Sequence, residues 1–95
     1  MTQKAPERIH LRISGHVQGV GFRWFVMSQA RRLDLAGWVR NNPDGSVELE
    51  AAGPADLLAV LRQRVKTGPR SARVDHVSEL PITSAELFNP FNVAR

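Results

Sequence analysis

The chain has 95 residues, a formal net charge of +4 from 13 basic and 9 acidic side chains, and no cysteine. A chain of this length forms one domain, which hides roughly 60–70 % of the surface of its unfolded state. Without cysteine it has no disulfide framework, no thiolate nucleophile and no thiolate metal site. The modest positive charge suits anionic partners, and it is also typical of an ordinary solvated surface.

Segments that would direct the chain to a membrane or out of the cell are not expected. Residues 1–7 are polar and contain Pro6, so they lack the apolar region of a signal peptide. The longest aliphatic run, residues 57–61, is far shorter than the roughly 20 residues that cross a bilayer. We therefore expect a flexible tail over residues 1–7, a single domain over residues 8–95, and a cytoplasmic protein that binds no membrane.

The first half of the chain has the pattern of a strand, a loop, a helix and a second strand. Apolar and polar residues alternate over residues 9–14, as in a strand with one buried face. A glycine-rich loop follows over residues 15–21, and the apolar residues then take helical spacing over residues 22–33. Residues 35–40 predict the second strand.

The second half of the chain predicts a hairpin, a helix and two further strands. The sequence Asn-Pro-Asp-Gly at residues 42–45 is a turn that leads into a strand over residues 46–51. A helix follows between the Gly-Pro pairs at 53–54 and 68–69. Residues 73–80 predict a fourth strand, with imperfect alternation that would fit a bulge, and residues 87–93 a short edge strand.

This order, βαββαβ, is the split βαβ plan of ferredoxin-like domains. We predict an α+β sandwich in which two helices cover one face of an antiparallel sheet of four to five strands. A crossover helix returns the chain so that the strands on either side of it run parallel. The carboxyl ends of the first two strands should therefore lie at the same edge of the sheet.

Groups that can hold an anion gather at that edge. Backbone N–H groups in the loop over residues 15–21 can form a concave nest, and the helix that follows adds partial positive charge. Arg23 lies in the first turn of this helix, and its planar guanidinium can grip two phosphate oxygens. Asn41 ends the second strand, where its carboxamide could hold a water and a phosphoryl oxygen, or simply belong to the turn.

Two stretches of the sequence resemble the signatures of the acylphosphatase family. The first is Ile13-Ser-Gly-His-Val-Gln-Gly-Val-Gly-Phe-Arg23, and the second is Gly37-Trp-Val-Arg-Asn41, followed by Gly45-Ser-Val47 and Gly53. The two matches occur in the right order with a helix between them, and the resemblance covers about residues 9–77. It implies an enzyme that hydrolyses the carboxyl–phosphate bond of small acyl phosphates.

The resemblance also implies the roles of individual residues. Arg23 would bind the phosphate, and Asn41 would orient the attacking water. The backbone amides of five loop residues would cradle the phosphate oxygens: His16, Val17, Gln18, Gly19 and Val20. Inorganic phosphate or sulfate would compete for this site, no metal or other cofactor would be needed, and the protein would be a monomer.

Two functions of other classes remain open at this point. Ferredoxin-like domains also bind RNA, and Gly21-Phe-Arg-Trp-Phe-Val faintly resembles an RNA-binding string. That string must lie on a central strand to stack bases, whereas here the aromatic residues follow helical spacing. The other alternative is a domain that binds anions without turnover.

The remaining polar and aromatic residues suggest simpler roles. His10, His16 and His76 are scattered and are not expected to bind a metal. Glu48 and Glu50 are expected to be solvated on the polar side of their strand. We expect Trp38 to pack in or beside the core, whereas Trp24 could line the site.

Overall fold

The computed structural model describes residues 7–94, in which the predicted elements are found in the predicted order. The predicted tail over residues 1–7 lies outside this range except for Glu7, with which the first strand begins. The elements are β1 (Glu7–His16), α1 (Phe22–Arg32), β2 (Ala36–Asn41), β3 (Val47–Gly53), α2 (Ala55–Thr67), β4 (Arg73–Glu79) and β5 (Asn92–Val93).

The strands form one sheet in the order β4-β1-β3-β2-β5. β3 is antiparallel to both β1 and β2, so these two strands run parallel with β3 between them. Their carboxyl ends therefore lie at the same edge of the sheet, as predicted. The fold class is confirmed, although the sheet is mixed, because the short strand β5 pairs with β2 in parallel.

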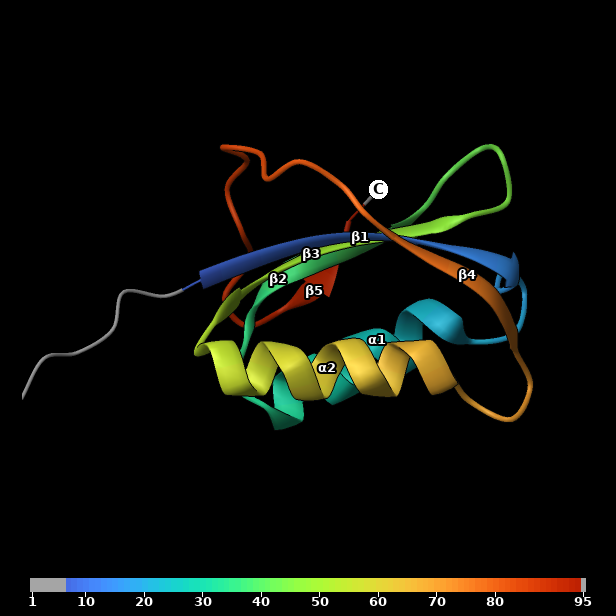
Figure 1. Cartoon of the computed structure of the whole chain (residues 1–95), viewed down its shortest axis with the longest axis horizontal. Coiled ribbons are helices and arrows are strands. Elements are labelled where there is room, and N and C mark those ends of the chain that lie inside the picture. Colours follow the sequence, from blue (N-terminus) through green and yellow to red (C-terminus); the bar gives the residue numbers. More distant parts are fainter. Residues whose placement is uncertain (1–6, 95) are drawn as a thin grey trace, which may run out of the picture.

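Both helices cover the same face of the sheet (Figure 1). The apolar sides of the strands and helices meet there in one core, because each strand alternates and each helix carries one apolar stripe. Its fully buried members include Leu11, Val26, Leu49, Leu61 and Phe91. No helix among residues 7–94 is long and apolar enough to cross a membrane.

The sheet has a bulge in β4, where the imperfect alternation placed it: the consecutive residues Ser14 and Gly15 of β1 pair with His76 and Val74, so Asp75 is the extra residue. The register between β1 and β4 shifts between Ser14 and Gly15. Gly15 has a φ of 132°, and a side chain there would strike the carbonyl oxygen of Arg73. The glycine thus lets the chain pass close to β4 before it enters the loop.

The opposite face of the sheet is covered by the segment that follows β4. Residues 80–91 cross this face before the chain joins the edge at β5 (Figure 1). Beneath them Glu48 and Glu50 are buried, so the expectation that they are solvated was wrong. Trp38 is also buried, and its ring contacts His10 edge to face. A strand that alternates in sequence is therefore buried on both faces here.

Candidate active site

The loop between β1 and α1 leaves a row of backbone donors without partners. Within residues 7–94, no acceptor is found for the backbone N–H groups of residues 17 to 24. Helix α1 also has no side-chain cap at its N-terminus, where Gly21 lies in the left-handed region. An uncapped helix end and successive free N–H groups favour an anion. These groups could cradle the oxygens of a phosphate.

Two glycines give this loop its curvature. Gly19 and Gly21 have φ values of 75° and 77°, which other residues rarely adopt. A Cβ atom added at either position would meet nothing within 4 Å. The requirement for glycine at these positions is therefore conformational, whereas at Gly15 it is also steric.

A hollow of about 260 Å³ opens beside the loop. It contains residues from the loop, from the first turn of α1 and from the ends of β2 and β5. Arg23 is exposed there and has no hydrogen-bond or ion-pair partner among residues 7–94, so its donors are free for a ligand. The lining residues are Val17, Gly19, Gly21, Phe22, Arg23, Trp24, Asn41 and Val93.

Asn41 also lines this hollow, and its side chain has an acceptor without a partner within the described residues. It is the last residue of β2, where its backbone pairs with Val47 of β3. The side-chain Oδ1 is buried and has no hydrogen-bond partner in the structure. A buried acceptor without a partner costs free energy unless a water or a ligand supplies a donor. Asn41 thus lines the hollow and carries an acceptor that the described protein groups leave unused.

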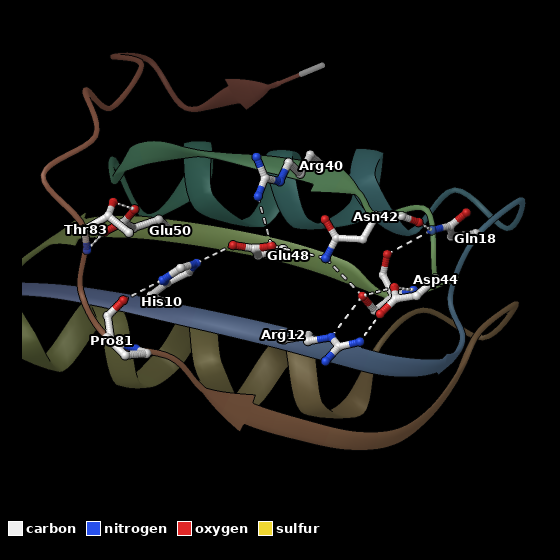
Figure 2. A network of polar contacts seen from close by, with 11 residues as sticks. His10, Arg12, Gln18, Arg40, Asn42, Asp44, Glu48, Glu50, Pro81 and Thr83 are labelled. Carbon is white, nitrogen blue, oxygen red and sulfur yellow. Dashed lines mark hydrogen bonds and ion pairs between the residues drawn. The ribbon is translucent and has the colours of Figure 1, made fainter.

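The Gln18 side chain connects the loop to the turn between β2 and β3. Its Nε2 donates to the backbone oxygen of Asn42 at 2.7 Å and to that of Ser46 at 2.8 Å (Figure 2). Both donors of the carboxamide are thereby used. Sequence reasoning gave Gln18 a role only through its backbone amide, because nothing in the pattern indicates which distant carbonyls a glutamine reaches.

A network of polar side chains supports the same turn from the far face of the sheet (Figure 2). The Asn42 side chain donates to Ser46 Oγ at 3.0 Å and to Glu48 Oε1 at 3.1 Å. Arg40 also donates to Glu48 Oε1, at 3.1 Å. His10 Nε2 lies 2.5 Å from Glu48 Oε2. Glu48 is thus the centre of the network.

The protonation of this network follows from its donors and acceptors. Burial acts to raise the pKa of Glu48, but hydrogen bonds from His10, Asn42 and Arg40 outweigh it and hold that pKa below 4.5. His10 Nδ1 faces the carbonyl oxygen of Pro81 at 2.8 Å, so this nitrogen must carry a proton. The imidazole thus bridges Glu48 and the carbonyl oxygen of Pro81.

Other kinds of site find little support in the described part of the chain. Residues 7–94 contain no group of three His, Cys, Asp or Glu side chains that could hold a metal ion. The central strands β1 and β3 carry no Phe, Tyr or Trp, whereas Phe22, Trp24 and Phe25 lie on α1. A base-stacking platform of the RNA-binding kind is therefore not formed by these strands.

Comparisons with known proteins show what this chain is similar to. The acylphosphatase family model matches residues 9–93. The acylphosphatase of Salinibacter ruber is 53 % identical over 89 residues, which are 94 % of either chain. The crystal structure of acylphosphatase from Bacillus subtilis has a TM-score of 0.84 at 38 % identity, and covers 93 % of this chain and 98 % of that one. An acylphosphatase from Coxiella burnetii has a TM-score of 0.82 at 39 % identity, and covers 99 % and 100 %.

Proposed function

Because this chain belongs to the acylphosphatase family and is a hydrolase of small acyl phosphates, we propose that Arg23 binds the phosphoryl group and Asn41 orients the water that attacks it. One observation carries the proposal. Arg23 with its free guanidinium, loop residues with unpaired N–H groups, and Asn41 with its unpartnered Oδ1 line one hollow.

The substrate phosphate would be held by the backbone N–H groups of His16, Val17, Gln18, Gly19 and Val20 together with Arg23. Among these, the N–H groups of residues 17 to 20 have no acceptor within residues 7–94, which supports their part in the cradle. The same donors would bind inorganic phosphate or sulfate, which should compete with substrate. Location in the cytoplasm and a monomeric state stay predictions.

The chemistry needs few groups beyond these. Water attacks phosphorus as the bond from phosphorus to the acyl oxygen breaks, giving carboxylate and inorganic phosphate, with the water's protons passing to phosphate oxygens and solvent. A carboxylate leaves without a general acid, so the protein has to supply position and charge stabilisation. By analogy with other phosphoryl transfers an arginine contributes about 10³–10⁵ in rate. One polar amide contributes roughly 10²–10³.

The two roles differ in the step at which each residue acts, and kinetics can separate them. Arg23 contacts the phosphoryl group in both the ground and the transition state, so Arg23→Ala should abolish turnover and weaken phosphate binding. Asn41 acts on the water only during attack, so Asn41→Ala should lower kcat by about 10²–10³ and change phosphate affinity much less. Both are measured by benzoyl phosphate hydrolysis and by titration with inorganic phosphate.

Asn42→Ala is the matched control. This change removes the bonds from the side chain to Ser46 and Glu48, but it keeps the backbone oxygen that accepts from Gln18. The variant should be less stable and still active at a temperature where it is folded. An Asn41→Ala variant with near-normal kcat, or an inactive folded Asn42→Ala variant, would show that the role of orienting water was given to the wrong residue.

A further inference from the structure

We infer that Trp24 binds the acyl group of the substrate and makes the enzyme favour planar, apolar acyl phosphates over acetyl phosphate. The inference rests on the proposed phosphate site at Arg23. It starts from an indole that is 66 % exposed, although it lies beside the residue proposed to bind phosphate. Of the large hydrophobic side chains that are exposed in the structure, Trp24 is the one that lines the hollow; Val60, Ile82 and Phe88 do not.

The fold gives no other reason for a tryptophan at this position. The Trp24 ring belongs neither to the core nor to the hydrophobic residues packed against it. Within residues 7–94 it has no aromatic or cation–π partner, whereas the other indole, Trp38, contacts His10 and Arg40. One exposed aromatic side chain is unremarkable in itself. Its place at the rim of a hollow with free anion donors is what points to a ligand.

The position of Trp24 suits the part of the substrate that the phosphate site does not hold. Arg23 and Trp24 are neighbours in the first turn of α1, about 100° apart around the helix. A phosphoryl group held by Arg23 and the loop therefore leaves its acyl substituent within reach of the indole. Val93 of β5 adds a second apolar side chain to the same hollow. An aromatic acyl group can stack on the indole, whereas an acetyl group offers one methyl.

The contribution of the indole to acyl-group binding can be measured by comparing benzoyl phosphate with acetyl phosphate. An aromatic contact of this kind corresponds to a change of about two- to twelve-fold in kcat/KM. Trp24→Ala should lower kcat/KM for benzoyl phosphate by that factor and leave acetyl phosphate nearly unchanged. The loss should appear mainly in KM, because the ring would be in contact both before and during the reaction. Trp24→Phe, which keeps an aromatic ring, should retain most of the preference.

Two control variants make the outcome specific. Ile82→Ala removes another exposed hydrophobic side chain that lies outside the hollow, and should not alter the ratio of the two substrates. Arg23→Ala should hydrolyse neither substrate. If it hydrolyses neither while Trp24→Ala leaves the ratio unchanged, the role of Trp24 is wrong and the phosphate site stands. If Arg23→Ala instead hydrolyses both substrates normally, the phosphate site is wrong and the inference falls with it.

Binding can be observed without turnover by NMR of the two indole N–H groups. Phenacylphosphonate and acetonylphosphonate replace the bridging oxygen of benzoyl and acetyl phosphate by a methylene group, so neither is cleaved at that bond. Phenacylphosphonate should shift the Trp24 signal, which the Trp24→Phe spectrum identifies, and acetonylphosphonate should shift it much less. Equal shifts with the two compounds, or none with either, would overturn the inference.

Discussion

Glu48→Gln tests whether the buried carboxylate on the far face of the sheet acts through its charge. The substitution keeps the shape of the side chain. Its remaining oxygen, placed as Oε1, can still accept from Arg40 and Asn42. The new NH₂ group would face His10 Nε2, where Oε2 now lies at 2.5 Å. The substitution therefore removes the negative charge that faces His10 and Arg40, and it replaces the acceptor at His10 by a donor.

The expected cost is that of one hydrogen bond to a charged group, about 1.5–3 kcal/mol. Breaking a buried ion pair can cost about 3–5 kcal/mol, but 12 % of the Glu48 side chain is exposed, and Arg40 and Asn42 can still donate to its other oxygen, so the lower range applies. A domain of this size loses about 4–8 °C in Tm per kcal/mol, so Tm should fall by about 6–24 °C. Urea unfolding followed by circular dichroism gives the free energy directly.

The pH dependence provides the test of the reasoning. The pKa of Glu48 is held below 4.5 in the folded state, so its contribution to stability is present above that pH and is lost as the pH falls through the native pKa. The difference in unfolding free energy between the wild type and Glu48→Gln should therefore shrink as the pH falls through the native pKa of Glu48. Arg12 of β1 lies opposite Glu48 but pairs with Asp44.

An exposed carboxylate serves as the comparison. Glu79 pairs with Arg62 at the surface, and Glu79→Gln should cost less than about 1 kcal/mol. If Glu48→Gln costs no more than this control, or if its cost is undiminished at a pH where the wild-type carboxyl is protonated, the charge of Glu48 does not stabilise the fold.

Three further outcomes are expected. Inorganic phosphate at a hundredfold excess over its Kd should stabilise the fold by about 2.7 kcal/mol, and a Tm indifferent to tens of millimolar phosphate would count against the anion site. Saturating chelator should leave benzoyl phosphate hydrolysis unchanged; a loss of activity that Mg²⁺ or Zn²⁺ restores would contradict the metal-independent mechanism. Gln18→Glu should lower kcat/KM much more than Gln18→Ala does, because its carboxylate would face the carbonyl oxygens of Asn42 and Ser46. Equal losses of kcat/KM in the two variants would refute this contact.

The local sequence pattern predicted the helices and strands well, because each combines a clear spacing of apolar residues with residues that typically begin or end such an element. The apolar spacing from Phe22 onward and the Gly-Pro pairs around α2 are local features, and the helices begin and end close to them. The juxtaposition of Arg23 and Asn41 could also be predicted, since a crossover helix makes the strands on either side of it parallel and so brings their carboxyl ends to one edge. Their chemical roles came from the family resemblance and remain to be tested.

The far face of the sheet could not be predicted, because its burial depends on a segment without periodicity. The alternation on β3 shows which side chains point away from the core. It does not show whether solvent or another segment of the chain covers them. Residues 80–91 have no regular pattern, yet Pro81 and Thr83 contribute contacts to His10 and Glu50. Such contacts join residues more than 30 positions apart, and a single sequence carries no local signal for them.

The two edges of the sheet also bear on how the protein behaves at high concentration. An open strand edge offers unpaired main-chain groups to other molecules and so invites aggregation. β4, at one edge, carries the exposed charges of Arg73, Asp75 and Glu79, which disfavour such pairing. At the other edge, Gly37 N donates to Phe88 O and Ala94 N to Val39 O, so the last residues shield β2. The segment that carries Val93 into the hollow thus also occupies main-chain groups of β2 that would otherwise be open.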